Sequence, residues 1–302
     1  MSWLEVSLTV DGELAEAVAD LLARHATGGV AIESALEGEE AAQPDTPVIV
    51  RAYLPADETL EERRTSVEQG LWHLGMIHPL PAPGYRSVAE EDWSEAWKEH
   101  YHPIRIGRRL LVLPAWLPSP NEDLLPIVLD PGMAFGTGTH PSTQLCLAAL
   151  EDHLHPGDEV VDLGCGSGIL SIAAVRLGAR RVLALDIDPL AVRITHENAE
   201  RNGVASQITV RAGSLADLLD ASPPVADLMV ANILAPVLDE MARQGLARAV
   251  RPGGVLILAG VLDVQAEGLE ATCLAHGLER LEQRQAGEWR ALILKSKPPY
   301  AS

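Results

Sequence analysis

The sequence predicts two domains, an α+β domain of ferredoxin-like pattern followed by an α/β domain with a mostly parallel sheet. The length of 302 residues suits two domains of ordinary size. Over the first 89 residues, strand-like and helix-like periods follow in the order strand, helix, strand, strand, helix, strand. After residue 103, strand runs alternate with helical periods, the pattern of a parallel sheet covered by helices. We therefore assign the domains to residues 1–89 and 104–302.

The front domain is expected to begin with a strand and a helix. Residues 3–10 alternate apolar and polar side chains as a half-buried strand does, and residues 13–25 repeat apolar positions at helical spacing. Two strands, a helix and a last strand are then expected at 30–32, 48–54, 59–74 and within 77–88. Helical spacing over residues 90–103 predicts a connector helix with Trp93 and Trp97 on one face.

Composition favours an ordinary globular protein. Hydrophobic residues make up 47% of the chain and charged residues 22%, so a sizeable core can be buried. No apolar run approaches the ~20 residues that a membrane span needs, and the N-terminus carries neither a basic segment nor a leader-like apolar stretch. The sequence therefore predicts a cytoplasmic protein without a membrane partner.

Cysteine and histidine spacing gives no sign of a disulfide framework or a metal site. The cysteines, Cys146, Cys165 and Cys273, are odd in number and far apart, which fits a reducing compartment. The close pair His100 and His102 has no acidic or cysteine partner at ligand spacing. We expect no metal.

Negative charge is concentrated at the front of the chain. The net charge is −20, and residues 1–103 carry 20 acidic and 6 basic residues, which leaves −6 for the rest. A front domain at −14 repels phosphate backbones and favours a cationic partner, so direct nucleic-acid binding is not expected. An equal alternative is that these charges serve only solubility.

The strongest motif of the second domain is a glycine-rich turn between a short strand, residues 160–163, and a helix. Gly164, Gly166 and Gly168 alternate in this turn. Alternate glycines let the backbone pass close to a small molecule, and the free amides at the helix start suit polar or carboxylate groups. A dinucleotide-binding fingerprint would need its third glycine at the position of Ile169, so that reading fails.

An acidic residue follows the next strand. Residues 181–185 end at Asp186, about 22 residues after Gly164, where a carboxylate can accept hydrogen bonds from both hydroxyls of a ribose. The alternative for Asp186 is a helix cap, but Asp188-Pro189 opens the next helix better. The two motifs together predict a nucleoside ligand.

A second glycine-rich loop, residues 130–140, precedes these motifs and is interpreted as a lid. It lacks the Gly-Lys-Ser/Thr ending of a phosphate loop, which disfavours a nucleoside triphosphate. The loop could also be only a tight entry to the helix predicted over residues 142–150.

An asparagine stands at the end of a third strand. Residues 225–230 read as a buried strand that runs on into Ala231-Asn232. Ligands of open α/β sheets bind at the carboxyl ends of strands, so Asn232 is expected to face the pocket. The alternative is an ordinary turn asparagine.

These motifs, taken in order with the Trp93-x-x-x-Trp97-Lys98 connector, resemble one known family. They are Leu129-Asp130-Pro131-Gly132-x-Ala134-Phe135-Gly136-Thr137-Gly138-x-His140, Asp162-x-Gly164-Cys165-Gly166-Ser167-Gly168-Ile169-Leu170, Asp186-x-Asp188-Pro189 and Ala231-Asn232-Ile233. The chain resembles the PrmA-type methyltransferases of large-subunit ribosomal protein eleven along nearly its whole length. One departure is Ser142-Thr143, where the family usually has paired threonines.

The resemblance implies a class I S-adenosylmethionine methyltransferase fold, which is Rossmann-like with a mostly parallel seven-stranded sheet. S-adenosylmethionine would be the cofactor and S-adenosylhomocysteine the product. The implied cofactor contacts are Phe135, Thr137, Thr143, Gly164, Gly166, Asp186 and Asn232. The implied substrate is a large-subunit ribosomal protein gripped by the front domain and methylated on amines, namely lysine side chains, with the N-terminal amine as a further candidate.

Methyl transfer from a sulfonium to an amine needs alignment and desolvation rather than a nucleophilic residue. By its position, Asn232 is hypothesised to hold the neutral amine, whereas Cys165 is expected to pack. Two alternatives stay open: the same fold could methylate RNA or a small molecule, or the chain could be a non-catalytic module that senses the cofactor. The sequence leaves the oligomeric state undecided.

Overall fold

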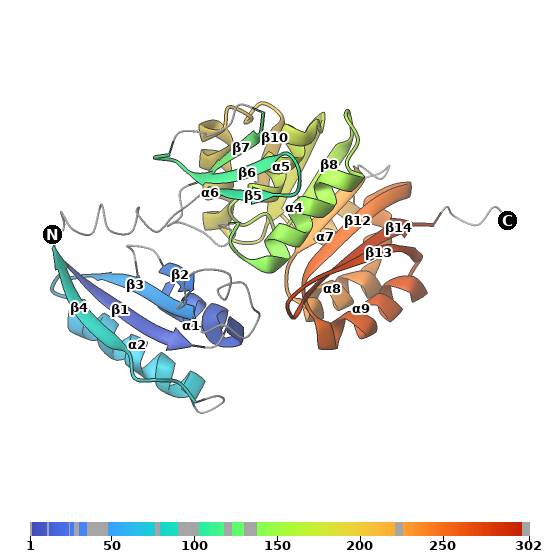
Figure 1. Cartoon of the computed structure of the whole chain (residues 1–302). Coiled ribbons are helices and arrows are strands. Elements are labelled where there is room, and N and C mark those ends of the chain that lie inside the picture. The colour runs from blue at the N-terminus through green and yellow to red at the C-terminus, as the bar shows by residue number, and fades with distance from the viewer. Residues whose placement is uncertain are drawn as a thin grey trace. The chain divides into compact units, whose positions relative to one another are not determined.

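The computed structural model describes residues 2–10, 12–23, 25–26, 30–34, 48–75, 79–89, 103–117, 123–129, 138–220 and 226–297. The chain divides into two compact units, Met1–His102 and Pro103–Ser302, called the front unit and the second unit below (Figure 1). The predicted connector helix lies outside the described residues except for its last position. No helix among the described residues is long and apolar enough to cross a membrane.

The front unit is one antiparallel sheet with two helices. Its elements are β1 (Ser2–Val10), α1 (Gly12–Ala23), β2 (Val30–Ser34), β3 (Val48–Pro55), α2 (Leu60–Gly75) and β4 (Gly84–Ala89). The sheet order is β2-β3-β1-β4, and every neighbouring pair is antiparallel. This is the predicted order of elements in a ferredoxin-like arrangement. The last strand begins at Gly84, later than the start of the stretch in which it was expected.

Alternation along the strands explains why this sheet has one covered face. Val6, Leu8 and Val10 of β1 point with Val50 and Leu54 of β3 into a core that α1 and α2 complete. The alternate positions on the opposite face include the polar side chains of Glu5 and Ser7 on β1 and of Arg51 on β3. The front unit therefore buries a core of its own.

The second unit is built on a seven-stranded sheet of order β10-β9-β8-β11-β12-β14-β13. The strands are β8 (Glu159–Leu163), β9 (Arg181–Asp186), β10 (Ile208–Ala212), β11 (Ala226–Asn232), β12 (Val250–Leu262), β13 (Leu278–Ala286) and β14 (Trp289–Ser296). The first five strands in this order pair in parallel, and β14 pairs antiparallel with both neighbours. The sheet is therefore mostly parallel, as expected.

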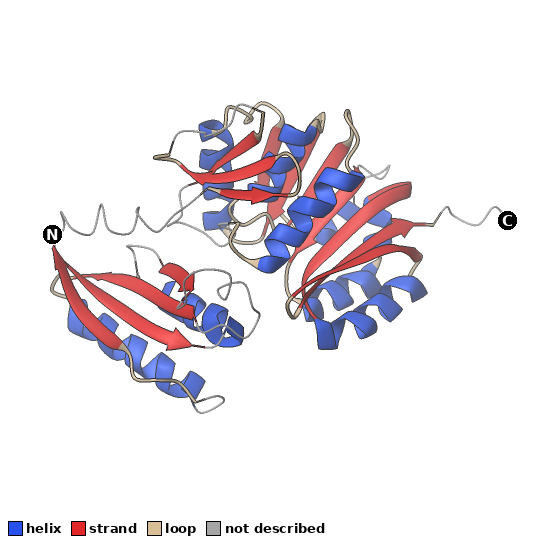
Figure 2. Cartoon of the chain, viewed as in Figure 1, coloured by secondary structure: helices blue, strands red, loops and turns tan. Residues whose placement is uncertain are grey.

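Helices cover both faces of this sheet (Figure 2). One face packs α4 (Pro141–His153), α5 (Ile169–Leu177) and α6 (Pro189–Arg201) into one large apolar cluster, and the other face packs α7 (Leu215–Leu219), α8 (Ala235–Gln244) and α9 (Asp263–Ala275) into a second. Burial of both faces explains why strands such as β8 read as near-continuous apolar runs.

A small additional sheet was not predicted. It has the order β5-β6-β7, formed by β5 (Ile104–Ile106), β6 (Leu110–Pro114) and β7 (Leu125–Leu129). All five residues of β6 are buried, and its side chains join the apolar cluster beside α4 and α5. The three cysteines are free and buried in the second unit.

Candidate active site

The glycine-rich loop links β8 to α5 at the carboxyl edge of the sheet. Gly164, Gly166 and Gly168 have φ of +78°, +54° and +80°, which side chains other than glycine rarely adopt. The N–H groups of Gly164 and Cys165 both donate to the carbonyl of Leu185 on β9, at 2.8 and 3.1 Å. The loop is thus attached directly to the strand that carries the predicted ribose ligand.

The carboxylate of Asp186 is turned toward this loop. Its Oδ2 accepts the N–H of Gly166 at 3.0 Å, and its Oδ1 accepts the N–H of Asp188 at 3.0 Å. The helix cap belongs to Asp188, whose side chain accepts the N–H of Leu190 at 2.8 Å, with Pro189 in the first turn of α6. Each carboxylate oxygen of Asp186 can accept a further hydrogen bond, so its capacity for a ligand remains.

Two polar residues of α6 that the sequence analysis missed support the loop from below. The hydroxyl of Thr195 donates to the carbonyl of Gly166 at 2.9 Å, and the amide of Asn198 donates to the carbonyl of Ser167 at 2.9 Å. Both side chains are buried. One feature of the sequence could have revealed them. They are two polar residues, three positions apart, on the helix face that also carries Ala191 and the other buried apolar positions of α6.

Asn232 is the last residue of β11, and its side chain is joined to α4. Its Nδ2 donates to Oγ1 of Thr143 at 3.1 Å, across 89 residues of sequence. Thr143 is buried at 1% exposure, whereas Asn232 is partly exposed. With Nδ2 engaged in this way, Oδ1 is the atom of the amide that can accept a hydrogen bond from a ligand.

The start of α4 is fixed by a histidine. His140 is the N-cap residue, and its Nδ1 accepts the N–H of Ser142 at 3.2 Å and lies 2.6 Å from the Ser142 hydroxyl. The imidazole meets the ring of Trp289 edge to face, with 4.5 Å between centroids. Ser142, the departure from the family pattern, therefore uses its hydroxyl in the helix cap.

The family is decided by the comparison with known proteins. The PrmA family model, described as ribosomal protein L11 methyltransferase, matches residues 2–297. The chain belongs to the PrmA family. The resemblance drawn from the motifs is confirmed.

Individual PrmA relatives align over nearly the full length. The ribosomal protein L11 methyltransferase of Chloroflexus aurantiacus is 45% identical, with 97% of each chain covered. That of Pelotomaculum thermopropionicum is 43% identical over 98% of this chain and 100% of the relative. The crystal structure of the ribosomal protein L11 methylase from Lactobacillus delbrueckii subsp. bulgaricus superposes with a TM-score of 0.58 at 34% identity, covering 66% of this chain and all of that one. The class I methyltransferase fold is confirmed with it.

A buried carboxyl lies directly beneath the glycine-rich loop of this PrmA protein. Asp162 on β8 is 0% exposed, and its Oδ2 accepts the hydroxyl of Ser171 on α5 at 2.7 Å. Its Oδ1 has no hydrogen-bond partner among the described residues. Burial raises the pKa of Asp162 to about 7, against the opposing effect of the Ser171 hydrogen bond. This carboxyl therefore keeps its proton to a much higher pH than an exposed aspartate does.

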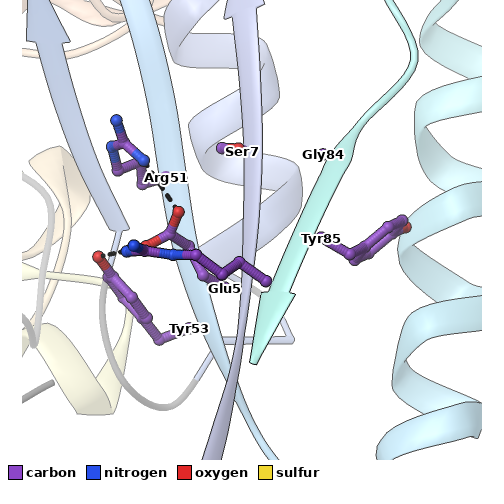
Figure 3. Close-up of a pocket in the computed structure, with 7 residues that line it drawn as sticks. Glu5, Ser7, Arg51, Tyr53, Gly84 and Tyr85 are labelled. Atoms are coloured by element: carbon purple, nitrogen blue, oxygen red, sulfur yellow. Dashed lines mark hydrogen bonds and ion pairs between the residues drawn. The ribbon is translucent and has the colours of Figure 1, made fainter. Parts of the chain in front are cut away.

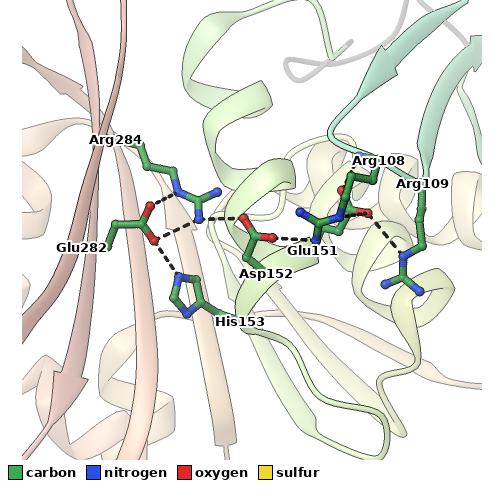
Figure 4. A network of polar contacts seen from close by, with 7 residues as sticks. All are labelled: Arg108, Arg109, Glu151, Asp152, His153, Glu282 and Arg284. Atoms are coloured by element: carbon green, nitrogen blue, oxygen red, sulfur yellow. Dashed lines mark hydrogen bonds and ion pairs between the residues drawn. The ribbon is translucent and has the colours of Figure 1, made fainter.

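The far end of α4 is held by ion pairs to two neighbouring elements (Figure 4). The carboxylate of Glu151, whose side chain is 1% exposed, accepts the backbone N–H of Arg108 at 2.7 Å, in the turn between β5 and β6. Asp152 pairs with Arg284 of β13 at 2.8 Å. The remaining members of this network are Arg109, His153 and Glu282. Since α4 also carries Thr143, the network fixes the helix that orients Asn232.

The structure brings together most of the predicted site residues. Gly164, Gly166, Asp186, Asn232 and Thr143 lie at the carboxyl edge of β8, β9 and β11 or on the helix beside it. Two further predicted cofactor contacts, in the lid, lie outside the described residues; they are Phe135 and Thr137. Cys165 packs as expected, since its Sγ lies 3.3 Å from the Thr195 hydroxyl and burial raises the pKa of its thiol to about 12.

Proposed function

We propose that this chain transfers methyl groups from S-adenosylmethionine to amines of ribosomal protein L11. The observation that carries the proposal is membership of the PrmA family over residues 2–297, whose described motifs meet at one edge of the sheet. We further propose that the second unit performs the transfer and that the reaction takes place in the cytoplasm.

The residues at this edge fit S-adenosylmethionine. Glycine at 164 and 166 lets the backbone of the loop come close to a nucleoside, and the loop leads into the N-terminal end of α5, where the helix dipole favours a carboxylate. Asp186 would accept the ribose hydroxyls with the lone pairs left after its two backbone hydrogen bonds. When bound, the cofactor would supply a methyl group attached to a positively charged sulfur. The sulfur is a good leaving group because it becomes a neutral thioether.

Asn232 is proposed to hold the acceptor amine. A lysine ammonium, with a pKa of about 10.4, must lose a proton before its nitrogen has a lone pair. Oδ1 of Asn232 would accept an N–H of the neutral amine, while Thr143 holds Nδ2 and so sets the plane of the amide. The new N–C bond forms as the S–C bond breaks, and the methylated ammonium can then release its proton to water. The chain contributes alignment and desolvation.

The front unit is proposed to recognise the substrate. The sheet of this unit carries a hollow of about 490 Å³ whose lining includes Glu5 and Arg51 (Figure 3). Arg86 also lines it. Glu5 is buried, and each of its carboxylate oxygens pairs with one arginine at 2.8 Å. Two guanidinium groups meeting one carboxylate give this hollow fixed polar geometry. The acidity of the front of the chain favours the cationic surface that a lysine-bearing substrate presents.

The experiment is intact-mass spectrometry of purified ribosomal protein L11 after incubation with this enzyme and S-adenosylmethionine. We expect mass gains in whole methyl increments that accumulate much more slowly with Asn232→Ala and with Asp186→Ala. S-adenosylhomocysteine binding should weaken more in Asp186→Ala than in Asn232→Ala. No mass gain with the wild-type enzyme, despite tight cofactor binding, would reject the substrate. A parallel reaction with ribosomal RNA tests the RNA alternative directly.

A further inference from the structure

The residue after Asn232 is enclosed by two glycines from different strand ends. A Cβ built on Gly164 would lie 2.5 Å from Cγ2 of Ile233. A Cβ built on Gly260 would lie 2.5 Å from the carbonyl oxygen of Ile233, 2.9 Å from its carbonyl carbon and 3.1 Å from its nitrogen. The side chain of Ile233 therefore rests on the glycine-rich loop, and its backbone rests on β12.

Gly260 can approach this closely because β12 bulges there. Its φ is +79°, and the register between β12 and β14 shifts between Leu258 and Val261. One residue earlier, the carbonyl of Ala259 accepts the N–H of Ile233 at 3.2 Å. The bulge thus presses β12 against the peptide group that follows Asn232.

We propose that Gly260 and Ile233 are positioning residues for Asn232, an inference that rests on the amine-holding role proposed above. The side chain of Asn232 is oriented by Thr143, but this hydrogen bond is useful only if the backbone of β11 ends at the right place. Ile233 fixes that place, because it packs so closely on Gly164 and Gly260 that neither position has room for a Cβ. A displacement of about 1 Å at such a group can reduce turnover about 100-fold.

The variant that tests this is Gly260→Ala, and the chain offers a matched control in Gly253→Ala. Both glycines lie on β12 with nearly the same φ, +79° and +81°. A Cβ at 253 would meet only the flexible end of Lys295, at 3.8 Å. Both variants carry the backbone strain, and only Gly260→Ala displaces Ile233. We expect kcat of Gly260→Ala to fall roughly 10- to 100-fold, with S-adenosylhomocysteine affinity close to that of the control. Equal kcat in the two variants overturns the proposal.

A double-mutant cycle with Asn232→Ala separates positioning from general damage. If Gly260 acts through Asn232, Gly260→Ala should lower kcat little further in a protein that already carries Asn232→Ala. The kcat of the double variant should then be close to that of Asn232→Ala alone. Multiplication of the two losses would refute the proposal. Ile233→Ala, which adds no backbone overlap, provides a second cycle with the same expectation if Gly260→Ala does not fold by circular dichroism.

Failure of the proposed function would be visible separately. If wild-type enzyme leaves ribosomal protein L11 unmodified, the substrate is wrong, and amide hydrogen exchange still tests the positioning. The N–H of Ile233 should then exchange faster in Gly260→Ala than in Gly253→Ala, because its bond to Ala259 is disturbed. Equal exchange in both variants would overturn the positioning role irrespective of activity.

Discussion

Replacing Asp162 with asparagine should change the stability of the enzyme in a pH-dependent way. The stability of Asp162→Asn minus that of wild type should be larger at alkaline than at acidic pH. The buried carboxyl of Asp162 has a raised pKa, about 7, because burial penalises its charged form. In the unfolded chain an aspartate titrates near 3.9. At pH between these values the unfolded state releases a proton that the folded state retains, so raising the pH favours unfolding. Above pH 7 the folded protein bears the full free-energy cost of burying the ionised carboxylate. Asparagine does not titrate, so Asp162→Asn does not bear this cost.

The magnitude follows from the two pKa values. A difference of about three units at 1.36 kcal/mol per unit gives a full penalty of about 4 kcal/mol. Roughly a third of it is already present at pH 5, so the change between pH 5 and pH 8 is about 2–3 kcal/mol. Any constant cost of burying the new amide beside Ser171 cancels in this comparison.

The assay is urea unfolding of both proteins, without cofactor, at pH 5 and pH 8 and at equal ionic strength. Groups that do not interact with Asp162 titrate alike in the two proteins, so the change in the stability difference reports Asp162 together with its electrostatic neighbour Asp186. We expect Asp162→Asn to gain about 2–3 kcal/mol of stability relative to wild type between the two pH values. A stability difference that is the same at pH 5 and pH 8 would show that the folded protein holds Asp162 ionised throughout, and would refute the burial argument.

Three further outcomes are expected. Asp186→Ala should weaken S-adenosylhomocysteine binding more than tenfold by calorimetry, since a charge-assisted hydrogen bond contributes about 1.5–3 kcal/mol; unchanged affinity would remove Asp186 from the ribose site. Thr143→Val should lower kcat up to roughly tenfold by removing the acceptor of the Asn232 amide, a neutral hydrogen bond of about 1 kcal/mol; wild-type turnover would contradict this orientation. Gly107→Ala should lower the free energy of unfolding in urea by at least about 2 kcal/mol more than Gly157→Ala does. Both glycines have positive φ, but only a Cβ at 107 meets the buried carboxylate of Glu151 at the end of α4. Equal losses of stability would argue against that contact.

The glycine-rich loop between β8 and α5 could be predicted from sequence because its geometry is local. Glycine at 164, 166 and 168 reports backbone conformations that other residues avoid, and the structure has positive φ at all three. The division of roles between Asp186 and Asp188 was equally local, since a proline directly after an aspartate is typical of a helix start. Features encoded within a few residues could therefore be assigned with their chemistry.

Features set by contacts between residues distant in the sequence could not be assigned in this way. Nothing near Ile233 in the sequence shows that it lies between Gly164 and Gly260, because each contact joins separate strands. Asp162 interrupts an apolar strand, and alternation alone cannot show whether such a residue faces a helix or solvent in a sheet covered on both sides. The small sheet of β5, β6 and β7 was missed for a related reason, since its central strand β6 is buried at all five positions and shows no alternation.

The polar groups of the site share one property that bears on rate. Both oxygens of Asp186 accept backbone N–H groups, the hydroxyl of Thr195 and the amide of Asn198 are used by the loop, and Nδ2 of Asn232 is held by α4. These groups are already oriented, so little reorganisation is needed when the amine and the cofactor meet. A site of this kind gains rate from fixed positions and has no way to adapt to displacement. Small backbone shifts, such as the one expected from a Cβ at Gly260, should therefore reduce turnover more than they reduce cofactor affinity or stability.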